Sequence, residues 1–162
     1  IHTFTGILIH KYYKLIIKNQ EDINEILSNK LDFIMAYFND YGFKVDEIKE
    51  AKKVITSSLN SLLNSKDGKW IYQLYQDDIM EAEYLFDEEN TYEKRIPDRT
   101  FIHDNKRWIV DYKVVFNDKN LIPEAKKHTT QLKKYEALFD DKYQIQKAIY
   151  FTAQGCLVLL WY

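Results

Sequence analysis

The 162-residue chain is poor in several residue types, and each shortage excludes a class of protein. It has one cysteine, Cys156, inside an apolar run, so a disulfide framework and a cysteine-based zinc or iron–sulfur site are excluded. Four glycines and two prolines argue against a disordered linker. No apolar run approaches the roughly 18 residues of a membrane helix, and the first nine residues lack the basic start and cleavage site of a signal peptide. We therefore expect a cytoplasmic protein with no membrane partner.

The charge is almost balanced, with a formal net charge of −2. A protein that captured DNA by charge alone would be basic, so this balance disfavours a free-standing DNA-binding protein. The length is typical of one domain with its own hydrophobic core. We expect a single domain over 1–162, with a helical part over about 1–76 and a sheet-containing core over about 77–162. Because the chain lacks an initiator methionine, we also expect it to be a fragment of a longer protein.

The periodicity of apolar residues changes from helical to alternating along the chain. Helical spacing predicts helices over 6–18, 21–39, 46–64 and 123–140. Apolar and alternating runs predict strands over 80–87, 94–102, 106–115, 148–152 and 157–161. The first of these helices carries an apolar stripe, formed by Ile7, Leu8, Tyr12, Leu15 and Ile16. Residues 103–106 predict a hairpin turn, since Asp and Asn tolerate turn backbone angles. This order of elements predicts an α/β fold with a mixed sheet.

Asp111 and Lys113 stand out in the otherwise apolar strand over 106–115. Residues two apart on a strand point to the same face, so an anion and a cation lie side by side. An exposed ion pair is one interpretation, and such a pair contributes about 0 to 1 kcal/mol. In a buried strand a purely stabilising role is unfavourable, because desolvation can exceed the Coulombic gain.

Asp98 lies upstream, directly after Pro97, where a turn residue is the simple interpretation. If Asp98 lies on a strand paired with residues 108–114, its carboxylate and that of Asp111 can reach one metal ion. Oxygen ligands in a partly hydrated site suit Mg²⁺, with Mn²⁺ as a substitute.

Further candidates lie on the first and last predicted helices. His10 is either a metal ligand or a hydrogen-bonded core residue. Gln131 and Tyr135, four residues apart, share one helix face and can also be a simple surface pair. The last helix has a basic surface, which is either a solvated face or the path of a phosphate backbone. Its lysines are Lys126, Lys127, Lys133 and Lys134.

Taken in order, these motifs resemble the RecB-type nuclease domain of the PD-(D/E)XK phosphodiesterase superfamily. The matching motifs are Gly6-x-x-x-His10, Glu81, Ile96-Pro97-Asp98-Arg99, Ile109-Val110-Asp111-Tyr112-Lys113 and Gln131-x-x-x-Tyr135. The chain looks most like the carboxy-terminal nuclease domain of AddA or RecB helicase–nuclease subunits. AddB-like and Cas-associated relatives typically carry the cysteines of an iron–sulfur cluster, which this chain lacks. The resemblance implies a restriction-endonuclease-like fold, in which helices flank a mixed central sheet.

The resemblance also implies roles for individual residues. His10, Asp98, Asp111 and the Tyr112 carbonyl would bind Mg²⁺, and Lys113 would orient the attacking water and stabilise charge on the phosphate. Gln131 and Tyr135 would brace the site or touch DNA, and Glu81, or its near neighbour Glu83, would complete it.

For partners, the resemblance implies single DNA strands from a double-strand end and a helicase motor in the same parent chain. It also implies an AddB-like or RecC-like partner subunit. The implied activity is Mg²⁺-dependent DNA cleavage, by an exonuclease or endonuclease, in the processing of ends for recombinational repair. Two alternatives stay open: a nuclease-fold module that guides DNA or docks subunits without cutting, and a free-standing phage-type or repair nuclease.

Overall fold

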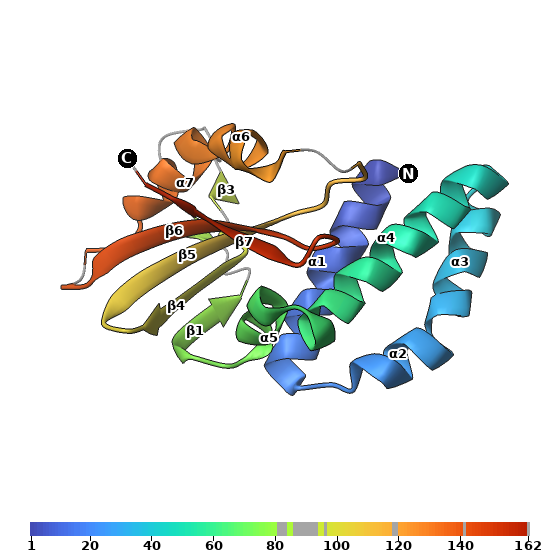
Figure 1. Cartoon of the computed structure of the whole chain (residues 1–162), viewed down its shortest axis with the longest axis horizontal. Coiled ribbons are helices and arrows are strands. Elements are labelled where there is room, and N and C mark those ends of the chain that lie inside the picture. Colours follow the sequence, from blue (N-terminus) through green and yellow to red (C-terminus); the bar gives the residue numbers. More distant parts are fainter. Residues whose placement is uncertain (81–83, 86–93, 96, 118–119, 141, 162) are drawn as a thin grey trace. The chain divides into compact units, whose positions relative to one another are not determined.

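The computed structural model of the chain, shown in Figure 1, describes residues 1–80, 84–85, 94–95, 97–117, 120–140 and 142–161. The chain divides into two compact units. The first comprises Ile1–Gln73, Lys113–Asp118 and Phe151–Cys156, and the second comprises Leu74–Tyr112, Lys119–Tyr150 and Leu157–Tyr162. Within the described ranges, no helix is both long enough and apolar enough to cross a membrane.

The described residues form a mixed α/β structure, which confirms the predicted class. The helices are α1 (His2–Asn19), α2 (Ile23–Asn29), α3 (Leu31–Asp40), α4 (Val45–Asn64), α5 (Lys66–Tyr72), α6 (Leu121–Lys126) and α7 (Thr129–Glu136). The strands are β1 (Gln76–Met80), β2 (Tyr84–Leu85), β3 (Lys94–Arg95), β4 (Arg99–His103), β5 (Lys106–Lys113), β6 (Gln144–Phe151) and β7 (Cys156–Leu160). Five strands form a mixed sheet in the order β1-β4-β5-β6-β7, and β2 pairs with β3 separately.

In the first unit, α4 contacts α1, α2, α3 and α5. A buried hydrogen bond joins α1 to α4, in which the Tyr13 hydroxyl donates to the Ser58 carbonyl at 2.5 Å. The helix over α1 is confirmed, but its apolar stripe is buried only in part, since Ile16 is buried while Ile7 and Leu15 are 63% and 39% exposed. The buried side chains of α1 are Thr5, Ile9, Tyr13, Ile16 and Ile17. Apolar residues occur around most of this helix, so periodicity alone does not select the face that packs.

Two predicted helices are each broken into two. The helix expected over 21–39 becomes α2 and α3, which are separated at Lys30. The helix expected over 123–140 becomes α6 and α7, with Lys127 and His128 between them. The break in the first case follows Ser28 and Asn29, residue types whose side chains compete for backbone hydrogen bonds and so weaken a helix.

In the second unit, the predicted hairpin is confirmed. The strands β4 and β5 pair antiparallel, with Arg99 opposite Val110 and His103 opposite Lys106. Asp104 and Asn105 form the connection with φ values of 49° and 57°. Positive φ at both central residues is the geometry of a type I′ turn, which matches the twist of the paired strands.

Acidic residues of β1 pair with arginines of the neighbouring strands. Asp78 accepts two hydrogen bonds from Arg99, at 2.9 Å from Nε and 2.6 Å from Nη2. The adjacent Asp77 accepts one from Arg107 Nη2 at 2.8 Å. The register between β1 and β4 shifts between Gln76 and Ile79, and Asp77 has a φ of 51°. Because of this irregularity, two consecutive carboxylates can each pair with a different arginine.

Two helical glycines should respond to alanine in opposite ways. At Gly68 in α5 an added Cβ would lie 1.8 Å from the Ser61 carbonyl oxygen, so backbone must move. We expect Gly68→Ala to lower the free energy of unfolding by about 1–3 kcal/mol or more. At Gly6 in α1 a Cβ meets no atom of the described chain within 4 Å. Gly6→Ala should therefore raise the free energy of unfolding by about 0.5–1 kcal/mol.

Urea denaturation followed by circular dichroism measures both variants. A Gly68→Ala protein as stable as the parent chain would contradict the close packing of α5 against Ser61. A destabilised Gly6→Ala protein would show that α1 has a neighbour at this position.

Candidate active site

Two carboxylates lie near one end of the β4–β5 pair. Asp111 is on β5, and Asp98 is in the bend directly before β4. The two strands pair with Arg99 opposite Val110 and Thr100 opposite Ile109, so Asp98 directly precedes the paired residues. Both are buried, Asp98 with 9% and Asp111 with 3% of its surface exposed.

A backbone hydrogen bond fixes the first of these carboxylates. The Tyr112 N–H donates to Asp98 Oδ2 at 2.7 Å. Hydrogen bonds from a backbone N–H to an ionised carboxylate are among the stronger ones in proteins. Asp98 is therefore held against the strand that carries Asp111, beside the Tyr112 peptide whose carbonyl is the predicted further ligand.

Lys113 is the last residue of β5 and is partly buried. Because it lies two residues beyond Asp111 on the same strand, its side chain leaves the strand on the face of Asp111. The end of the strand is held by a backbone bond, in which the Thr152 N–H donates to the Lys113 carbonyl at 3.0 Å. Lys113 belongs to the first unit, so its role beside the carboxylates stays a prediction, as it does for His10.

Helix α7 adds a phenol and an amide to this cluster. Gln131 Nε2 donates to the Tyr135 hydroxyl at 3.0 Å, and Tyr135 is buried while Gln131 is exposed. Burial, and next the negative charge of Asp111, raise the pKa of Tyr135 to about 12, with a smaller effect of Asp98. The phenol therefore keeps its proton at neutral pH and can donate a hydrogen bond. Tyr135 also lies close enough to sense both carboxylates.

The structure thus brings together Asp98, Asp111, Gln131 and Tyr135 within the second unit. His10 is partly exposed on α1 and belongs to the first unit, so its role as a ligand stays a prediction. The predicted Glu81 and its neighbour Glu83 lie outside the described residues. Within the part of the chain that is described, no three His, Cys, Asp or Glu side chains form a metal-binding group.

The oxygen donors present fit a hard divalent cation. Mg²⁺ usually binds proteins through one or two carboxylates and keeps several of its waters. Asp98 and Asp111 supply two carboxylates, and the Tyr112 carbonyl lies in the same short segment as Asp111. Oxygen donors suit this ion better than a soft metal.

An ion pair that the sequence did not predict connects α7 to the sheet. Lys147 on β6 is 1% exposed, and its ammonium donates to Glu136 Oε1 at 2.5 Å. Glu136 directly follows Tyr135 and is the last residue of α7, so the pair fixes the end of this helix to β6. Arg107 adds to this connection, since its guanidinium lies 4.7 Å from the ring centroid of Phe139 just after α7. The signal in the sequence was a lysine within the apolar run of β6.

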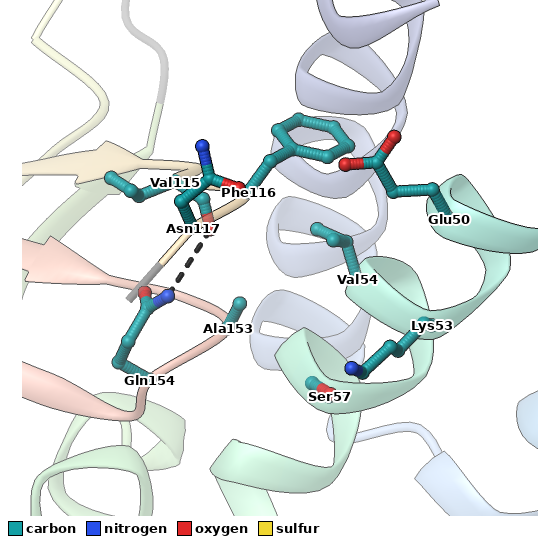
Figure 2. A pocket seen from close by; sticks show the side chains of 9 residues that line it. All are labelled: Glu50, Lys53, Val54, Ser57, Val115, Phe116, Asn117, Ala153 and Gln154. Carbon is teal, nitrogen blue, oxygen red and sulfur yellow. Dashed lines mark hydrogen bonds between the residues drawn. The ribbon is translucent and has the colours of Figure 1, made fainter. Parts of the chain in front are cut away.

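A separate cavity of about 430 Å³ lies within the first unit. Figure 2 shows side chains from α4 on one side of it and from two loop segments on the other. Gln154 is oriented there by the hydrogen bond from its Nε2 to the Val115 carbonyl at 3.1 Å. The lining residues are Glu50, Lys53, Val54, Ser57, Val115, Phe116, Asn117, Ala153 and Gln154. None of the carboxylates of the second unit lines this cavity.

Neither a protein-family model nor a curated protein matches the chain. The candidate site therefore rests on its own residues, their register and their contacts. These observations define which chemistry the site supports.

Proposed function

We propose that this chain is a metal-dependent deoxyribonuclease domain of the RecB type, with a restriction-endonuclease-like fold. The observation that supports the proposal most is the hydrogen bond that holds the Asp98 carboxylate against the strand that carries Asp111, with Lys113 two residues further along that strand. Two carboxylates that hold a metal ion, with an amine near them, can support hydrolysis of a phosphodiester. The five-stranded mixed sheet with α6 and α7 on one side of it is compatible with that fold (Figure 1).

In the proposed reaction, a water oxygen bonds to phosphorus and releases a proton to the solvent, the bond from phosphorus to the leaving oxygen breaks, and that oxygen takes up a proton from the solvent. Asp98, Asp111 and the Tyr112 carbonyl would hold Mg²⁺, which supplies a more acidic water and polarises the phosphate. The Lys113 ammonium would orient the attacking water and offset the negative charge that grows on the phosphate. The protonated Tyr135, oriented by Gln131, would donate a hydrogen bond to the phosphate.

The wider role that we propose is the processing of double-strand DNA ends for recombinational repair. A helicase motor in the same parent chain would deliver single DNA strands to the site. An AddB-like or RecC-like subunit would complete the assembly. Delivery by a motor removes the need for a strongly basic nuclease domain, in keeping with a net charge of −2.

Degradation of labelled linear DNA tests the activity. We expect the chain to shorten single-stranded DNA with Mg²⁺ or Mn²⁺ and to be inactive in EDTA. Single- and double-stranded substrates of the same sequence, labelled at either end, would show the preferred strand form and the polarity.

Metal binding by calorimetry on the same sample gives the second measurement. Binding of Mg²⁺ or Mn²⁺ without any cutting, also when the chain is joined to a helicase motor, would contradict the enzymatic proposal. That result would favour a module that guides DNA or docks subunits.

A further inference from the structure

The outer surface of α6 and α7 carries four exposed lysines, which we call the lysine face. They are Lys126, Lys127, Lys133 and Lys134. The two glutamates of these helices both accept from lysines, Glu124 from Lys127 at 2.7 Å and Glu136 from the buried Lys147 at 2.5 Å. The lysine face therefore has an excess of positive charge, although the whole chain has a net charge of −2.

The lysine face borders the candidate active site through Gln131. Gln131 and Lys134 are three residues apart on α7, so their side chains lie on neighbouring positions of the helix surface. Gln131 is exposed, yet its amide reaches the buried Tyr135 hydroxyl at 3.0 Å. Tyr135 in turn senses the charges of Asp111 and Asp98. The exposed lysines, Gln131, Tyr135 and the two buried carboxylates thus all belong to the second unit.

We propose that the lysine face is the track along which the phosphate backbone of a single DNA strand reaches the carboxylates. The proposal rests on the proposed function for its end point, but the binding surface is a separate property. Lysine binds phosphate as a flexible point charge and carries no sequence information. The positive charge would also offset the repulsion between the DNA and the buried carboxylates.

The charge distribution favours DNA over an anionic membrane. A membrane-binding helix surface pairs its lysines with a broad apolar face. On α6 the large apolar side chain of Ile122 is 57% exposed, while the apolar Leu132 and Tyr135 of α7 are buried. A phosphate backbone needs only the charges.

Fluorescence anisotropy with a labelled 30-nucleotide single strand in EDTA measures binding without cutting. We expect Lys126→Gln/Lys134→Gln to weaken binding about tenfold at moderate salt. Each lost phosphate contact should also reduce the slope of log K against log salt by about 0.7. The matched control is Lys30→Gln/Lys49→Gln, which removes the same charge from exposed positions in the first unit and should change neither quantity.

The possible outcomes separate the two proposals. Selective loss of binding in the lysine-face variant supports the track, whether or not the chain cuts DNA. Equal loss in both variants, no loss in either, or no DNA binding by the parent chain would overturn it. Vesicles of phosphatidylserine and phosphatidylcholine provide the other arm, and loss of vesicle binding alone would assign the surface to a membrane instead. Normal lysine-dependent binding without metal-dependent cutting would refute only the nuclease proposal.

Discussion

The substitution Asp111→Asn is expected to abolish metal-dependent DNA cleavage while the fold stays intact. Asparagine has the shape of aspartate but lacks the negative charge that would hold Mg²⁺ beside Asp98. Asp111 is 3% exposed, and burying an ionised carboxylate costs desolvation free energy. We therefore expect the cleavage rate to fall at least about a hundredfold, and the thermal midpoint to stay the same or to rise.

Two further variants test whether the loss of cleavage is confined to substitutions in the candidate site. Lys113→Met should also lower cleavage by about 10²–10³-fold, because the ammonium would stabilise charge that grows in the reaction. Asp104→Asn is the matched control, since Asp104 is 84% exposed at the turn of the same hairpin. It should cut DNA at the parental rate. If Asp111→Asn and Lys113→Met both cut normally, the assignment of the site is wrong.

The β4–β5 hairpin shows which part of the candidate site could be predicted from sequence. Asp104 and Asn105 tolerate positive φ, so the position of the turn followed from local chemistry. Once the turn is placed, counting outward along both strands sets Arg99 opposite Val110 and brings Asp98 to the end of the hairpin that carries Asp111. Local rules therefore predicted the hairpin, while the roles of the two carboxylates stay a prediction.

Other features depend on tertiary partners and were missed. Strand β1 was missed because Gln76, Asp77 and Asp78 look like loop residues, whereas Asp77 and Asp78 pair with arginines of the sheet. Most of the strand predicted over 80–87 lies outside the described residues. The pairing of Lys147 with Glu136 joins a strand to a helix, so the lysine in β6 is visible in the sequence while its partner is not. The packed face of α1 could be predicted only in part, because this helix has apolar residues on most sides.

The same long-range pairing makes Asp78→Ala the substitution with the largest expected effect on stability. Arg99 is fully buried, and Asp78 binds it through both oxygens at 2.9 and 2.6 Å. Burial opposes the charge of Arg99, but Tyr112 and Asp78 raise its pKa overall, so the guanidinium stays protonated. Removing the carboxylate leaves a buried cation, and we expect the free energy of unfolding to fall by about 3–5 kcal/mol.

The double variant Asp78→Ala/Arg99→Met separates the loss of the ion pair from the cost of leaving a buried charge. If the buried cation causes the loss, adding Arg99→Met to Asp78→Ala should restore part of the stability, although it removes a further residue of the pair. Urea unfolding of the single and double variants measures this coupling. A double variant less stable than Asp78→Ala alone would show that Arg99 stabilises the sheet mainly by packing on Phe101, whose ring centroid lies 4.9 Å from its guanidinium carbon. Cleavage by the same two variants can also be measured, because Arg99 directly follows Asp98. If Asp78→Ala lowers cleavage and the double variant restores it, the backbone of this segment, rather than the ion pair, positions the Asp98 carboxylate.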